Sequence, residues 1–170
     1  MIDHSLAWLH GELHEMRWLL LGGTLLLGFG LSAKLLGTTP YARGVAWPLI
    51  LFGIAVLAMG ASFTYNNLQR QRAWPQAYEA DAAGFAEAER ERVAEFVAWY
   101  PRTRLIGVGI ALASLLVLLY AEASGFDATA RPSLWGWGFV GFMLVGFLFV
   151  VDHFSEERAR VYAVALGVEV

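Results

Sequence analysis

Four long apolar runs, separated by polar stretches, dominate the pattern of this 170-residue chain. They cover residues 19–36, 45–63, 105–120 and 134–151, and Lys34 is the only charged residue within them. Each run has about the length of roughly 17–25 residues that an α-helix needs to cross the hydrocarbon core of a bilayer. The pattern therefore predicts an all-α, polytopic membrane protein built as a bundle of four transmembrane helices.

The polar stretches divide this single membrane domain, residues 1–170, into parts. We expect an amphipathic leader at 1–16, spans at 17–36, 45–65, 105–121 and 134–151, a cytoplasmic segment at 66–104 and a cytoplasmic tail at 152–170. In the cytoplasmic segment, residues 83–100 place apolar side chains on one face and charged ones on the other. We interpret them as an interfacial helix that Pro101 ends. Packing of this helix on a partner helix is the alternative.

Composition narrows the possible functions. The chain is 58% hydrophobic and 16% charged, which is too apolar for an ordinary soluble domain. A net charge of −3 without a broad basic surface argues against a nucleic-acid partner. The absence of cysteine excludes disulfides and thiolate metal sites. We expect no cofactor, and the first partner is the lipid bilayer.

Positive residues predict the orientation, because Lys and Arg collect on the cytoplasmic side of membrane proteins. One side would carry both termini, the 66–104 segment and nine positive residues, against three on the other side. This predicts cytoplasmic N- and C-termini. The residues expected at the two interfaces are Trp18, Trp47, Trp74, Trp99, Trp135, Arg70, Arg72, Arg158 and Arg160.

The two halves of the chain resemble each other after a shift of 88 residues. The shift aligns Trp47 with Trp135, Gly53 with Gly141, and the Arg-x-Arg at 70–72 with the one at 158–160. This favours a tandem repeat of two hairpins in the same orientation. Coincidence between similar apolar segments is the alternative.

Small residues mark the surfaces where helices are expected to approach closely. They are Gly107 with Ala111, Gly109 with Ala113, and Gly138 and Gly141. These spacings predict close packing, either within the bundle or between protomers, and so favour a homo-oligomer or a complex with another membrane protein.

Histidine offers the best candidate chemistry. His10 and His14 lie one helical turn apart, a spacing that suits two imidazoles on one divalent metal, and His153 follows the fourth span. Solvated histidines at a membrane-proximal helix are the alternative. No catalytic residues are predicted.

Two stretches, the sequence YARG at 41–44 with WPL at 47–49 and the sequence DHFSEERA at 152–159 with Tyr162, carry a resemblance. The chain resembles small four-span bacterial inner-membrane proteins of uncharacterised function. The resemblance implies a bacterial inner-membrane location and a partner role, and it transfers no active site.

Three functions follow as hypotheses. The first is a non-enzymatic membrane protein that acts by assembling with itself or a partner, as an accessory subunit or a toxin-immunity protein does. The second is a small homo-oligomeric ion channel, although the spans have no charged residue at their middle. The third is a metal-dependent membrane enzyme at the cytoplasmic face.

Overall fold

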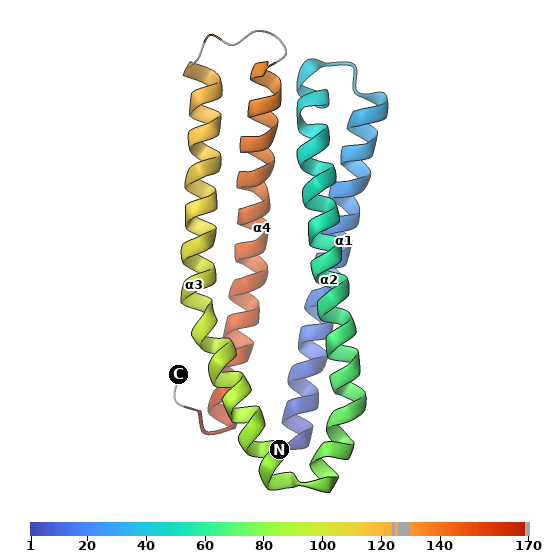
Figure 1. Ribbon diagram of the computed structural model, residues 1–170, viewed down its shortest axis with the longest axis vertical. Coiled ribbons are helices and arrows are strands. Elements are labelled where there is room, and N and C mark those ends of the chain that lie inside the picture. Colours follow the sequence, from blue (N-terminus) through green and yellow to red (C-terminus); the bar gives the residue numbers. More distant parts are fainter. Residues whose placement is uncertain (124, 126–129, 169–170) are drawn as a thin grey trace.

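A computed structural model describes residues 1–123, 125 and 130–168, and four long helices make up almost all of this part of the chain. They are α1 (Ile2–Leu36), α2 (Pro40–Ala80), α3 (Ala82–Ala123) and α4 (Ala130–Ala165). They form the bundle in Figure 1, which confirms the predicted all-α fold. Residues 124 and 126–129, between the third and fourth spans, lie outside the described residues, as do the last two residues of the tail.

All four helices are long and apolar enough to cross a membrane, so this is a multi-pass membrane protein. With 35–42 residues each, they extend about 52–63 Å, roughly twice the 30 Å hydrocarbon thickness. Figure 1 shows both termini in the same half of the molecule as the α2–α3 connection. The helices therefore extend beyond the spans mainly at one end, which we name the polar end.

The helix boundaries have local causes. Thr39 caps α2, because its hydroxyl accepts a hydrogen bond from the Ala42 backbone N–H at 3.1 Å, and Pro40 occupies the first turn. At the polar end, Asp81 alone separates α2 from α3. Its side chain accepts from the Gly84 N–H at 2.9 Å and so caps α3. This one-residue connection forces the two helices to run antiparallel.

The structure corrects one expectation about the polar segments. Residues 83–100 are continuous with the third span rather than a separate helix in the membrane plane, as the leader is with the first span. Pro101 does not end this helix; it removes one backbone hydrogen bond within it. Val93 and Tyr100 are 1% and 4% exposed. In Figure 1 the lower part of α3 runs in a different direction from its upper part, as expected of a proline kink.

Glycines allow close helix contacts within and between the two hairpins. In the α1–α2 hairpin, a Cβ added to Gly53 would lie 2.6 Å from the Leu27 backbone nitrogen. In the α3–α4 hairpin, a Cβ at Gly141 would lie 2.7 Å from the Ser114 hydroxyl oxygen. Gly44 of α2 abuts the Pro132 backbone of α4 and joins the hairpins at the end opposite the polar end.

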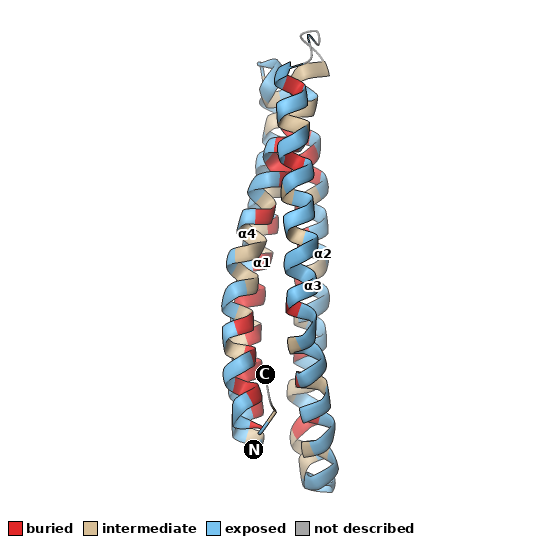
Figure 2. Ribbon diagram, turned by 90° about the vertical axis from the view of Figure 1, so that its left-hand side faces the viewer, coloured by how far each residue is buried: buried red, intermediate tan, exposed pale blue. Residues whose placement is uncertain are grey.

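The polar end has a core of its own. Its buried residues are Trp8, Leu9, Trp74, Val93, Tyr162, Ala163 and Leu166, which come from all four helices and the residues just after α4. Figure 2 shows buried residues along the sides of the helices that face one another. The extensions beyond the spans are thus a packed bundle, and the residues where this bundle meets the spans form the candidate site.

Candidate functional site

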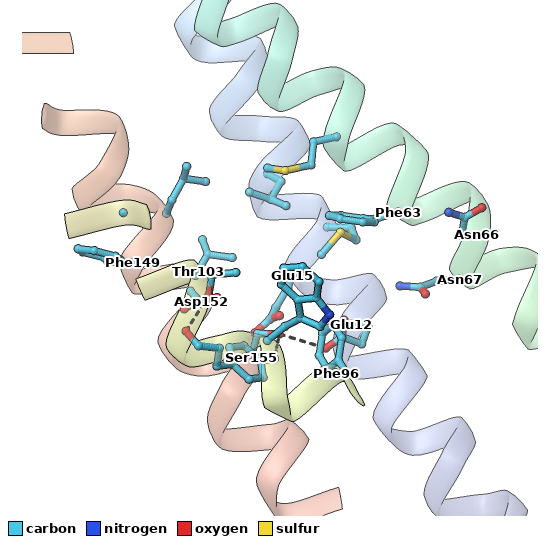
Figure 3. A pocket seen from close by; sticks show the side chains of 18 of the residues that line it. Glu12, Glu15, Phe63, Asn66, Asn67, Phe96, Thr103, Phe149, Asp152 and Ser155 are labelled. Carbon is cyan, nitrogen blue, oxygen red and sulfur yellow. Dashed lines mark hydrogen bonds between the residues drawn. The ribbon is translucent and has the colours of Figure 1, made fainter. Parts of the chain in front are cut away.

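A cavity of about 660 Å³ lies between the two hairpins, where the spans meet the polar end (Figure 3). All four helices contribute to its wall. Its volume is within the roughly 300–1,000 Å³ of small-molecule sites in proteins. In Figure 3 the side chains of Glu12, Glu15 and Ser155 lie near the centre, and those of Asn66 and Asn67 face them from α2.

The wall changes character along the bundle. Towards the spans it is apolar, formed by Leu19, Met59, Phe63, Ile106, Gly107, Ile110, Val145, Leu148 and Phe149. Towards the polar end it carries charged and polar groups, namely Glu12, Glu15, Asn66, Asn67, Arg70, Arg92, Glu95, Thr103, Asp152 and Ser155. One continuous space therefore has an apolar part at membrane depth and a charged part at the membrane boundary.

Two carboxylates on α1 share one cation. Glu12 and Glu15 are 6% and 5% exposed. Arg158 of α4 forms an ion pair with Glu15, and its Nη2 lies 3.7 Å from Glu12 Oε1. Glu15 Oε2 is buried and has no hydrogen-bond partner among the described residues. One guanidinium thus serves two buried carboxylates and leaves the pair with excess negative charge.

Hydroxyl groups connect this pair to α3. The Tyr100 hydroxyl donates to Ser155 Oγ at 3.0 Å, and Ser155 Oγ donates to Glu12 Oε1 at 3.4 Å. Asp152, one turn before Ser155 on α4, lines the same cavity. No salt bridge to Asp152 is found among the described residues. Asp152 is therefore the second source of negative charge in the wall.

Towards the polar end, Arg92 forms part of the cavity wall, and its guanidinium group already interacts with other side chains. It forms a bidentate salt bridge with Glu89, in which the Arg92 Nε–H donates to Glu89 Oε2 at 2.9 Å. Its guanidinium carbon also lies 4.6 Å from the centre of the Trp8 ring. Tyr162 donates to Glu89 at 2.7 Å and stacks on Trp8. This network fixes the position of Arg92 but leaves little of its charge for a ligand.

Burial shifts the pKa values of the acidic groups, all of which lie outside the predicted membrane-spanning segments. Burial, helped by the charge of Glu15, raises the pKa of Glu12 from 4.5 to about 7. Burial also raises the pKa of Glu15. For Asp152, burial and the nearby Glu156 raise the pKa. Arg158 opposes the first two shifts without cancelling them, and a pKa of about 7 lets Glu12 take up a proton near neutral pH.

Positions that the 88-residue shift makes equivalent face the same cavity. Six such pairs line it, which are Trp8 and Phe96, Glu12 and Tyr100, Glu15 and Thr103, Leu19 and Gly107, Phe63 and Val151, and Asn67 and Ser155. At the opposite end, Gly44 contacts its own equivalent, Pro132. Such contacts between equivalent positions are expected when two hairpins pack around an approximate two-fold axis. The cavity lies at the centre of this arrangement, where repeat proteins of membranes commonly place their ligand sites.

The predicted metal residues lie apart from this cavity. His10 is bonded through Nε2 to Gln71 at 3.0 Å, His14 packs edge-on against the Trp18 ring, and His153 lies against Phe154. In the part of the chain that the structure describes, no three His, Cys, Asp or Glu residues form a group that could hold a metal ion. The structure thus does not bring the three histidines together.

The predicted interfacial residues divide into two groups. Trp18, Trp47, Trp99, Arg72 and Arg160 are exposed, and Trp135 is half-buried. The other three lie inside the bundle. Trp74 belongs to the core of the polar end, Arg70 lines the cavity, and Arg158 pairs with the buried carboxylates.

Most of the predicted small packing residues serve contacts within the chain. An added Cβ would meet Phe149 at Gly107, Leu118 at Gly138 and Ser114 at Gly141, whereas none of the described atoms lies within 4 Å at Gly109. Ala111, one turn beyond Gly107, is half-buried, and Ala113 is exposed. Assembly between protomers through Gly109 and Ala113 stays a prediction.

Sequence reasoning missed the acidic wall. Glu12 and Glu15 stand three residues apart in the leader, and the apolar stripe Ile2, Leu6, Leu9, Leu13 and Met16 implies that they face outward. The buried face keeps Leu9 and Met16 of this stripe and also includes Ser5, Trp8, Glu12, Glu15 and Leu19. The sequence feature that could have revealed this face is the repeat. The 88-residue shift aligns the face with Phe96, Tyr100 and Thr103, which lie on successive turns of α3.

Comparison with protein-family models, curated proteins and solved structures gives no match. The fold therefore defines the class of protein, a multi-pass membrane protein with a four-helix bundle. Any statement about function rests on the cavity itself.

Proposed function

We propose that this membrane protein acts by binding an amphipathic molecule in the cavity between its hairpins. The observation that carries the proposal is the change in the wall from apolar at membrane depth to charged at the membrane boundary. An amphiphile has the same division along its length. Its tail would remove the apolar wall from water, which contributes about 25 cal/mol per Å² of apolar surface buried.

Access and volume both support this proposal. The apolar wall includes Ile106 and Ile110, whose side chains are also 59% and 49% exposed on the outer surface of α3. A tail entering from the bilayer would pass these residues without crossing water. A cavity of about 660 Å³ has the size of sites for single small molecules, and not of an aqueous pore.

Filling the apolar part of the cavity should abolish binding. Val145 of α4 is 5% exposed and lines the cavity, whereas Val150 on the same helix is 57% exposed. In nanodiscs, we expect Val145→Phe to weaken binding of the neutral fluorescent probe N-dodecyl dansylamide at least tenfold, because the added ring occupies the space of the tail. Val150→Phe introduces the same ring outside the cavity and should bind the probe like the wild type. Equal binding by both variants and the wild type would contradict the proposal.

We further propose that the polar end faces the cytoplasm of a bacterial cell, with the spans in the inner membrane. The excess of positive residues at this end supports the orientation. The chain has no cysteine, so single cysteines report on topology directly. A membrane-impermeant maleimide added to intact spheroplasts should label Thr38→Cys and leave Glu87→Cys unlabelled. The opposite labelling would reverse the orientation.

Assembly with a second copy or another membrane protein stays compatible with this function. Binding of an amphiphile does not exclude an accessory or immunity role, and native mass in a mild detergent measures the assembly separately.

A further inference from the structure

We propose that the amphiphile carries a cationic nitrogen, an amine or ammonium group, which the acidic wall formed by Glu12, Glu15 and Asp152 recognises. This inference rests on the proposed function, because it names the head group of the same ligand. The charge around the cavity and its distribution over the two halves of the chain both support it.

The charge balance leaves negative charge without a partner. Glu12 and Glu15 share Arg158, and Asp152 has no salt bridge among the described residues. Of the two arginines in the same wall, Arg92 is already paired with Glu89, and Arg70 has no salt bridge among the described residues, so one unpaired cation faces the three carboxylates. Because buried carboxylates are costly to leave unpaired, a cation in the cavity would gain both ion-pair and hydrogen-bond energy.

Glu15 keeps one buried carboxylate oxygen, Oε2, without a hydrogen-bond partner among the described residues. Glu15 lines the cavity, and its side chain is 7% exposed. An ammonium group has only donors, and a carboxylate oxygen only accepts. An anionic or purely hydroxylic head group would satisfy this oxygen less well.

The two halves of the chain differ where the head group would lie. The shift pairs Glu12 with Tyr100 and Glu15 with Thr103, so one hairpin supplies carboxylates where the other supplies hydroxyl groups. The framework is thus shared by both halves, whereas the carboxylate pair comes from α1 and Asp152 comes from α4. Phe63 and Phe96 complete the wall with aromatic surface, on which alkylated ammonium groups bind favourably.

Protons should compete with the cation at this wall. The groups that face Glu12 are Glu15 on α1, Arg70 on α2, Arg92 and Tyr100 on α3, and Ser155 and Arg158 on α4. Burial and Glu15 raise the pKa of Glu12 to about 7. Below that pH the wall loses negative charge, so an amine that stays protonated should bind less tightly at pH 5 than at pH 8.

Three amphiphiles with one tail and different heads test the inference. Dodecylammonium, dodecanol and dodecanoate each compete with N-dodecyl dansylamide for the protein in nanodiscs of digalactosyldiacylglycerol, a neutral lipid without an amine, with empty nanodiscs as the reference for partitioning. We expect dodecylammonium to displace the probe at a concentration at least tenfold lower than dodecanoate. Equal potency, or greater potency of dodecanoate, would overturn the cationic head group. Failure of the probe to bind at all would instead overturn the proposed function.

Substitutions of the wall give a second readout. Asp152→Asn keeps the shape of the side chain and leaves the Arg158 ion pairs in place. It should reduce the potency of dodecylammonium roughly tenfold and leave that of dodecanol unchanged. Glu157→Gln, exposed on the same helix and outside this cavity, is the matched control and should change neither. If Asp152→Asn does not fold, Glu12→Gln tests the same wall while Glu15 keeps Arg158. Unchanged potency in a folded variant of either kind contradicts the inference.

The amine could belong to a membrane lipid or to a free lipophilic cation, and one further arm separates these sources. Phosphatidylethanolamine in the nanodiscs should displace the probe if the ligand is the lipid, since its phosphate can also reach Arg70, which has no salt bridge among the described residues. Phosphatidylglycerol, which has no amine, should not displace it. Displacement by dodecylammonium but not by phosphatidylethanolamine assigns the site to free cations. Displacement by phosphatidylglycerol as strong as that by phosphatidylethanolamine would overturn the inference.

Discussion

Replacing Arg158 with alanine should destabilise the protein by about 2–3 kcal/mol at pH 8, less than the roughly 3–5 kcal/mol of a fully buried ion pair because the Arg158 side chain is itself 35% exposed. Arg158 is paired with both Glu12 and Glu15, whose side chains are only 8% and 7% exposed. Its loss leaves these two buried carboxylates, one helical turn apart, without a positive charge to balance theirs. Thermal unfolding in nanodiscs should show a fall in Tm of roughly 10 °C.

The destabilisation should depend on pH. Burial raises the pKa of Glu12 from 4.5 to about 7, so between these values the folded state binds more protons than the unfolded state. Stability of the wild type therefore falls as pH rises through this range, and the absence of Arg158 steepens the fall. At pH 5 Glu12 is neutral, so Arg158→Ala should lose less stability at this pH than at pH 8. If Arg158→Ala lowers the stability equally at pH 5 and pH 8, the arginine stabilises the protein by packing alone.

Arg160→Ala is the matched control on the same helix. Arg160 is 55% exposed and pairs with Glu156, which keeps Arg104 as a second partner. Surface ion pairs typically contribute about 0–1 kcal/mol, so this variant should unfold close to the wild type at both pH values. Equal losses for the two arginine variants would contradict the special role of Arg158.

Gly53→Leu should cost about 3 kcal/mol or more, because the α1–α2 contact has no room for a side chain. A Cβ at this position would lie 2.6 Å from the Leu27 backbone nitrogen and 3.1 Å from the Gly23 carbonyl oxygen. Backbone atoms cannot move aside without separating the helices. The expected result is a large fall in Tm together with loss of the monodisperse peak in size-exclusion chromatography.

Gly146→Leu tests whether this effect is specific to the helix contact. None of the described atoms lies within 4 Å of a Cβ at Gly146, and this residue is exposed on α4. The same glycine-to-leucine change should therefore leave Tm within a few degrees of the wild type. A similar loss for both variants would point to a general intolerance of larger residues in the spans.

The spans could be predicted from the sequence because charge-free runs as long as a bilayer is thick are typical of transmembrane helices and rare elsewhere. The structure of the polar segments was harder to predict. The amphipathic face of residues 83–100 is equally compatible with a membrane surface and with a protein core, and only the position of α3 distinguishes them. Local rules also placed too much weight on Pro101, because an internal proline can bend a helix without ending it.

The cavity could not be predicted from single helices. Glu12 and Asp152 are 140 residues apart in the chain, and either one alone resembles an ordinary acidic residue near a membrane surface. Both residues line the same cavity only because of the way the two hairpins pack together. The repeat was the only long-range signal in the sequence, and the equivalence of Glu12 with Tyr100 is what relates it to the cavity.

Photo-crosslinking tests most directly whether an amphiphile occupies this cavity. A dodecylamine with a diazirine in the middle of its tail would be irradiated with the protein in nanodiscs, and the modified residues identified by mass spectrometry of peptides. The account predicts adducts on cavity residues of both hairpins, such as Met59, Ile110 and Leu148, that excess dodecylammonium removes. Adducts confined to lipid-facing residues such as Leu116 and Val150, unaffected by the competitor, would contradict it.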